Sequence, residues 1–175
     1  MRRYTHSILV VFIILIPIMS KIAYARNISE YKIKAGFIYN FARFTQWPES
    51  TSHINICLYG KDNFGSYLDD LNGKMINGKS IKTKRIRVLK SIESCNVVFL
   101  NITPPDKYNF KRVLNKIKNK NILTMSDTKN ATDYGVMVGL VIENGRVGFN
   151  VNYTEINKTE LKISSQLLKL AKKVI

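Results

Sequence analysis

The sequence predicts a single α/β domain in three layers, a mixed β-sheet with helices on both faces. Two features of the pattern support this fold class. Segments with helical periodicity alternate with short apolar runs that are typical of buried strands. Near the end, two β-rich runs flank an Asn-Gly pair, which predicts a C-terminal β-hairpin followed by a helix. We find no linker long enough to divide the 175-residue chain.

Residues 1–25 have the order of parts of a secretory signal peptide. Arg2 and Arg3 precede an almost wholly apolar run, Ile8 to Met19, and the small-x-small pattern Ala23-Tyr24-Ala25 follows. The run is shorter than the roughly 20 residues that span a bilayer. We therefore expect cleavage after Ala25 and a domain over residues 26–175; an uncleaved membrane anchor is the alternative. The exported chain would carry 25 Lys and Arg against 12 Asp and Glu, a net charge of +13.

The first half of this domain is expected to hold two helices and two strands. A capped start at Asn27 and apolar residues at helical spacing predict a helix that ends near Trp47, before Pro48. Its inward side chains would be Ile33, Phe37, Phe41 and Phe44. The elements expected next are a strand over His53–Tyr59, a short helix over Phe64–Leu71, and a half-exposed edge strand over Ser80–Val88.

The second half begins with a strand buried on both faces. The run Val97–Leu100, within Asn96–Asn101, is continuously apolar, which favours burial on both sides of the sheet. The elements expected after it are a helix from Pro104 to about Lys118, a strand over Ile122–Met125, the hairpin strands Val136–Ile142 and Val147–Val151, and a last helix over Lys158–Val174. In that last helix, Leu161, Ile163, Leu167, Leu168, Leu170 and Val174 would face inward.

The residues of the exported chain offer no convincing catalytic set. Its one imidazole, His53, stands at a predicted strand start, and we expect a solvated strand-end residue there rather than a base. Asp69 and Asp70 are adjacent at a helix end and would point in different directions. The Gly60–Gly65 segment lacks the Lys-Ser/Thr of a phosphate loop. With two cysteines and so few histidines, we expect no metal centre, no cofactor and no enzymatic activity.

Cys57 and Cys95 are the two cysteines of the chain. Exported proteins with an even cysteine count commonly oxidise them. Cys57 lies within one predicted strand and Cys95 directly precedes another, and neighbouring strands are close enough for a disulfide. We expect the bond Cys57–Cys95; two reduced, buried thiols are the alternative.

Cations gather in two segments that could bind a polyanion. They are Lys74, Lys79, Lys82, Lys84, Arg85, Arg87 and Lys90 in one, and Lys111, Arg112, Lys116, Lys118 and Lys120 in the other. Export makes nucleic acid an unsuitable partner, so anionic lipid headgroups or an acidic protein domain fit better. A solvated lysine-rich surface is the alternative. If a partner binds, we expect Lys82, Lys84 and Arg87 on the predicted edge strand to contact it.

Six segments, in order along the chain, resemble the YfiR-like family of periplasmic proteins. They are Lys34–Pro48, Cys57–Gly65, Leu71–Lys79, Leu123–Asp127, Glu143–Asn152 and Leu161–Ala171. The resemblance implies an α/β periplasmic regulator without catalytic activity. It implies that the target is the periplasmic region of an inner-membrane diguanylate cyclase. We expect the partner to be such an inner-membrane signalling protein, a diguanylate cyclase or a sensor kinase. Release of the cyclase would raise cyclic di-GMP and promote biofilm formation.

The resemblance also implies a homodimer, and Cys57 and Cys95 match one cysteine pair of the family. A second pair found in some members is absent from this chain. Another class of function remains open at this point: a small-molecule or polymer-binding module of the cell envelope.

Overall fold

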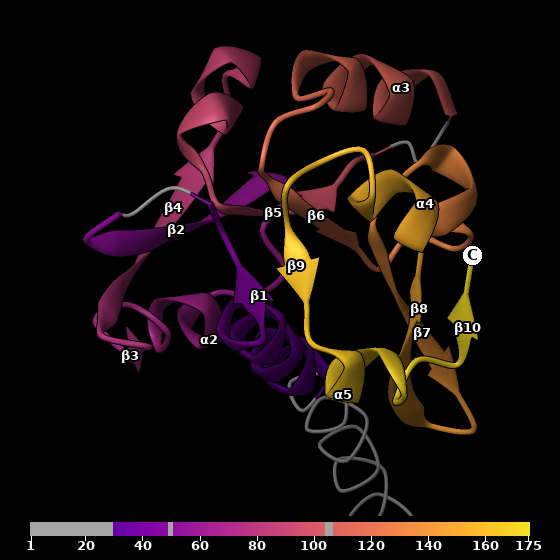
Figure 1. Ribbon diagram of the computed structural model, residues 1–175, viewed down its shortest axis with the longest axis horizontal. Helices are drawn as coiled ribbons and strands as arrows, with labels where there is room; N and C mark the ends of the chain where they lie inside the picture. The colour runs from indigo at the N-terminus through magenta and orange to yellow at the C-terminus, as the bar shows by residue number, and fades with distance from the viewer. Residues whose placement is uncertain (1–29, 49–50, 104–106) are drawn as a thin grey trace, which may run out of the picture.

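The computed structural model describes residues 30–48, 51–103 and 107–175, and it has the predicted α/β fold (Figure 1). The predicted signal peptide, residues 1–25, lies outside the described residues. In the part of the chain that is described, no helix is long and apolar enough to cross a bilayer.

The core of the fold is an eight-stranded mixed sheet in the order β10-β8-β7-β6-β5-β2-β4-β3. Its parallel strands are β2 (His53–Gly60), β4 (Lys79–Ile86), β5 (Val97–Asn101), β6 (Leu123–Ser126) and β7 (Val138–Glu143). The remaining strands are β3 (Met75–Ile76), β8 (Arg146–Val151) and β10 (Lys173–Val174). From β2 the chain builds outward to β4, then crosses back to place β5 on the other side of β2. The strand order therefore reverses between β2 and β5.

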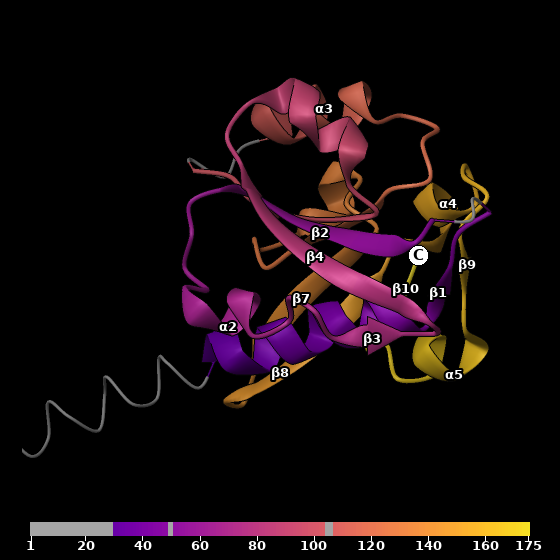
Figure 2. The ribbon, with the colours of Figure 1, turned by 90° about the vertical axis from the view of Figure 1, so that its left-hand side faces the viewer.

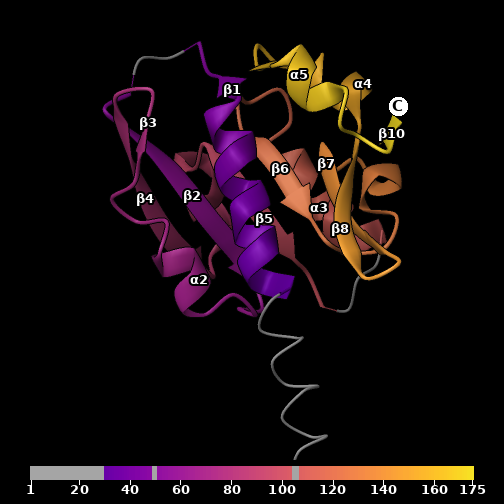
Figure 3. The same cartoon turned by 90° about the horizontal axis from the view of Figure 1, so that it is seen from below.

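Helices cover both faces of this sheet (Figure 2). The first helix, residues 30–43, and α2 (Ser66–Asp69) lie on one face. Figure 3 shows the first helix in front of β2 and β5. The 3-10 helix η1 (Leu89–Ser94) and α3 (Lys107–Lys116) lie on the other face, which η2 (Ala131–Tyr134) also contacts. Each face has its own apolar cluster, because alternate side chains of a strand point to opposite sides.

The hairpin prediction is confirmed by β7 and β8, which pair in an antiparallel register from Val138–Val151 to Glu143–Arg146. Asn144 and Gly145 connect the strands with φ angles of 51° and 72°. Two successive residues with positive φ give the turn that suits the twist of a hairpin, and Asn and Gly adopt that conformation most readily.

The prediction of a single helix over Lys158–Val174 is wrong. A short helix, α4 (Tyr153–Ile156), ends before this segment, and the segment itself forms β9 (Lys162–Ile163), α5 (Ser165–Leu168) and β10. β9 pairs with β1 (Thr45–Gln46) in a small second sheet, and β10 pairs with β8. These tertiary pairings satisfy backbone groups that a helix would have used, in a segment whose Thr and Ser residues are weak helix formers. Leu161 and Leu167 are buried, whereas Leu170 is 70% exposed.

The first helix ends earlier than predicted and buries a different stripe. Its regular turns stop at residue 43, and the chain continues into β1. Phe41 is fully buried as expected, but Ile33 is 46% exposed. The buried stripe consists of Lys34, Ala35, Ile38, Phe41 and Ala42. The buried face of the helix therefore differs from the predicted face and includes a charged residue, Lys34. Apolar periodicity alone does not identify a buried lysine.

Candidate functional site

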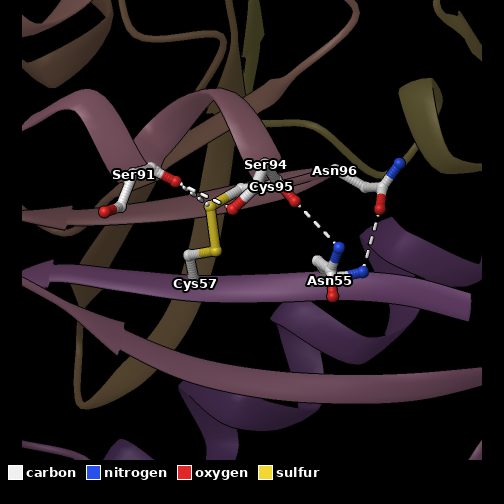
Figure 4. Close-up of a disulfide and its surroundings, with 6 residues drawn as sticks. All are labelled: Asn55, Cys57, Ser91, Ser94, Cys95 and Asn96. Atoms are coloured by element: carbon white, nitrogen blue, oxygen red, sulfur yellow. Dashed lines mark hydrogen bonds between the residues drawn. A yellow bond between two sulfur atoms is a disulfide. The ribbon is translucent and has the colours of Figure 1, made fainter.

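The disulfide Cys57–Cys95 links β2 to the end of η1 (Figure 4). The two Cα atoms are 6.0 Å apart, within the usual range for a disulfide. Both residues are buried and belong to the apolar cluster beneath η1 and α3. The described residues contain no free cysteine. The bond therefore fastens the η1 segment to the centre of the sheet.

Polar contacts reinforce this fastening beside the disulfide (Figure 4). The Asn55 side-chain amide donates to the Ser94 carbonyl oxygen at 2.8 Å, and the Asn55 backbone N–H donates to Asn96 Oδ1 at 2.8 Å. The Asn96 backbone N–H in turn donates to the Asn55 carbonyl oxygen at 2.9 Å. The start of β5 is thereby held in a fixed position against β2.

Lys82 and Lys84 lie on β4 next to this fastened region. Their register partners on β2 are Asn55 and Cys57. Ile86, two residues beyond Lys84, packs in the cluster under η1 and α3, so Lys82 and Lys84 point toward that same face. Both lysines are exposed. Within the described residues, neither Lys82 nor Lys84 forms an ion pair.

Arg87 is separated from these two lysines. It follows the last residue of β4 and lines a hollow that also contains Arg112 of α3. The structure thus brings Lys82 and Lys84 together on one strand and places Arg87 at the end of that strand.

Arg85, the cation between these residues, is engaged on the opposite face of β4. Its Nε donates to Asp62 Oδ2 at 2.7 Å, its guanidinium also pairs with Asp69, and Nη2 donates to the Gly65 carbonyl oxygen at 2.7 Å. Burial by itself raises the pKa of Asp62. The hydrogen bonds from Arg85 and from two backbone N–H groups outweigh that effect and hold the pKa below its usual value. Arg85 therefore fixes α2 to the sheet and is not available to a partner.

Lys34 forms a buried charge cluster that the sequence analysis missed. Its Nζ lies 2.5 Å from a carboxylate oxygen of Glu30 and 2.5 Å from one of Asp127, and its side chain is only 3% exposed. Burial alone lowers the pKa of Lys34, but the hydrogen bonds and charges of Asp127 and Glu30 outweigh burial and raise it. The ammonium group also stands 4.5 Å from the centre of the Tyr31 ring. Position 34 lies on the same helical stripe as Ala35 and Ile38, which is the one signal that could have found it.

The described residues show little that could perform catalysis. His53 Nδ1 lies 3.0 Å from Ser52 Oγ in an exposed pair, and no described side chain forms a further contact that orients the imidazole. Nowhere in residues 30–48, 51–103 and 107–175 do three or more His, Cys, Asp or Glu side chains gather in a way that could hold a metal ion. The notable features of the candidate site are the disulfide that links η1 to β2 and the exposed cations of β4.

Comparison with known proteins decides the family. The model of the YfiR/HmsC-like family matches residues 31–172. The chain belongs to the YfiR/HmsC-like family. This family is regulatory and non-catalytic. The match covers nearly the whole described chain, including both cysteines, Lys34 and the cations of β4.

A solved structure of an ABC domain in complex with L-Trp from Streptococcus pneumonia is also similar to the chain. The TM-score is 0.48 and the sequence identity 12%, over 70% of this chain. The chain spans 55% of the length of that structure's chain.

Proposed function

We propose that this protein is a periplasmic, non-enzymatic regulator that binds the periplasmic part of an inner-membrane signalling protein and restrains it. A diguanylate cyclase is the first candidate for that partner, so the protein would control cyclic di-GMP and biofilm formation. The observation that carries the proposal is membership of the YfiR/HmsC-like family over residues 31–172.

The disulfide supports the proposed compartment. Disulfides persist in oxidising compartments such as the bacterial periplasm and are rare in the cytosol. Cys57–Cys95 closes a loop with a sequence separation of 38 residues within the apolar cluster of one sheet face. The signal-peptide pattern of residues 1–25 supplies the route of export.

The cations of β4 support a protein partner of opposite charge. We propose that Lys82 and Lys84 contact an acidic surface of the partner and that Arg87 extends this contact beyond the strand end. Exposed charges of one sign accelerate association with a complementary surface more than they tighten the final complex. The proposal includes a homodimer, as in the family, which light scattering would test.

Deletion and complementation in the native host test the function. Deleting the gene should raise cyclic di-GMP and surface attachment, and a plasmid copy of the full chain should reverse both. A copy that lacks residues 2–25 should fail, because it would not reach the partner. A full-length Lys82→Glu/Lys84→Glu copy should restore less than a Lys32→Glu/Lys169→Glu copy, which carries the same charge change on other exposed lysines.

Unchanged cyclic di-GMP after deletion, in a strain shown to express the protein, would contradict the cyclase target. A sensor kinase, or the envelope-binding module considered above, would then become the better hypothesis. A small molecule or polymer that is retained through purification would favour the binding module.

A further inference from the structure

A hollow of about 390 Å³ opens at the carboxyl ends of β2, β4 and β5, on the side of α3. The residues around it include Tyr59 of β2, Arg87 just after β4, Ile102 just after β5, and Arg112 of α3. In open α/β sheets, ligands bind outside the carboxyl ends of the strands where the strand order reverses. Because the order of this sheet reverses between β2 and β5, the hollow lies at that position.

Beside the hollow, the ends of β2 and β5 are in close contact. Gly60 ends β2 with a φ of 103°, and a Cβ atom built there would lie 2.1 Å from the Asn101 carbonyl oxygen. The Lys61 backbone N–H donates to the Asn101 carbonyl oxygen at 3.1 Å, and Asn101 Nδ2 donates to the Lys61 carbonyl oxygen at 2.8 Å. The ends of β2 and β5 are therefore tied together, with no room for a side chain between them.

The two arginines are carried by backbone segments that pack on the same core. Arg87 follows Ile86, which is 8% exposed, and Arg112 precedes Val113, which is 1% exposed. Ile86 and Val113 belong to one apolar cluster. The segment after β4 and the helix α3 thus hold two guanidinium groups at one hollow. Both arginine side chains remain exposed and can reach a ligand.

Among the described residues, no acidic side chain compensates the positive charge around the hollow. None of the described residues that line it is acidic, and neither Arg87 nor Arg112 forms an ion pair within the described part of the chain. Arg85, two residues before Arg87, shows the contrasting case, because Asp62 and Asp69 already occupy its donors. A planar guanidinium with free donors matches carboxylate and phosphate oxygens in a bidentate manner.

We propose that this hollow binds a small anion that carries a carboxylate or phosphate group. Arg87 and Arg112 receive the anionic group, and Tyr59 and Ile102 contact the rest of the molecule. The site does not depend on the proposed membrane partner, so it can be tested with the isolated protein.

Titration of the exported protein with two probes, inorganic phosphate and succinate, tests the site at constant ionic strength. Backbone amide signals are followed by NMR in the wild type, in Arg87→Gln/Arg112→Gln, and in Lys90→Gln/Lys118→Gln. The last variant is the matched control, since it loses the same charge from exposed lysines outside the hollow. Retained signal dispersion in each variant reports that it has folded.

At least one probe should shift the amides of Gly60, Arg87, Thr103 and Arg112 in a saturable way. Loss of both arginines should weaken binding about tenfold or more, and the control should change it less than about twofold. Saturation by phosphate alone, by succinate alone or by both supports the site and tells which anion chemistry it accepts. Equal weakening in the control, shifts scattered over the surface, or no saturable shift with either probe would overturn the proposal.

Discussion

Both helical layers of this protein pack on the sheet through an apolar cluster, but the links that reinforce this packing differ. The layer of the first helix and α2 adds ion pairs to its apolar cluster, those of Lys34 with Asp127 and those of Arg85 with Asp62 and Asp69. The layer of η1 and α3 adds the disulfide to its apolar cluster, and its ion pairs, those of Glu93 with Lys116 and Lys120, join η1 to α3 and the segment after it rather than to the sheet.

This difference decides which cations are available for binding. The first layer uses Lys34 and Arg85 to hold itself together. The second uses Lys116 and Lys120, which pair with Glu93, whereas Lys82, Lys84, Arg87 and Arg112 remain exposed on or near it. A count of lysines and arginines therefore overestimates the number of cations that a partner can contact. Only the cations without an ion pair inside the protein belong to the binding surface.

The largest effect is expected from removal of the disulfide. Replacing Cys57 and Cys95 together by Ala should lower the free energy of unfolding by about 4 kcal/mol, because the unfolded chain loses a constraint on a loop of this length. Urea denaturation of the variant and of the reduced wild type should give similar losses. A loss below about 1 kcal/mol in both would show that η1 is held by packing alone.

The next effect is expected at Lys34. Lys34→Met should lower the free energy of unfolding by about 3 kcal/mol, because it leaves Glu30 and Asp127 without their shared cation. The control is Lys32→Met on the same helix, at an exposed position, which should change stability by less than about 0.5 kcal/mol. Equal effects of the two substitutions in urea denaturation would contradict the role of the buried cluster.

A smaller, pH-dependent effect is expected at Asp62. The lowered pKa of Asp62 means that its stabilisation is complete above the unfolded value of 3.8 and is lost as pH falls through the folded value. Asp62→Asn should cost about 1 kcal/mol at pH 7, since both partners are about one-third exposed. This difference from the wild type should vanish below the folded pKa in acid unfolding curves. A difference that persists there would assign the loss to packing rather than to charge.

The smallest effect on stability is expected from Lys82→Glu/Lys84→Glu, less than about 0.5 kcal/mol, because both side chains are exposed and unpaired within the described residues. Association with the periplasmic region of the partner should nevertheless slow about tenfold at low salt. Surface plasmon resonance at rising salt should reduce this difference, because the Debye length shrinks to about 8 Å at physiological ionic strength. An association rate equal to that of the wild type would remove these lysines from the interface.

The sequence predicted the elements whose pattern is local. The apolar run Val97–Leu100 identified β5, and Asn144-Gly145 identified the hairpin, because in each case a short segment determines its own structure. The prediction for the segment after Asn157 was wrong because tertiary contacts, not local pattern, determine its structure. Its helical spacing of leucines was overridden by pairing with β8 and with β1, a strand that lies far away in the sequence.

The same contrast between local pattern and tertiary contacts applies to the candidate site. Lys82 and Lys84 could be placed on one exposed strand from alternation alone. The engagement of Arg85 by Asp62 and Asp69 could not, because it depends on how α2 packs against β4. The pairing of Lys34 with Asp127 joins residues 93 positions apart, and periodicity carries no information at that separation.

Site-specific photo-crosslinking in living cells tests the central claim most directly. A photoreactive amino acid is placed at position 84, on the face of η1 and α3, or at position 32, on the exposed surface of the first helix. The account predicts that position 84 captures an inner-membrane protein with a diguanylate cyclase or other signalling domain, identified by mass spectrometry, and that position 32 does not. Capture of that protein from position 32 but not from position 84 would contradict the account.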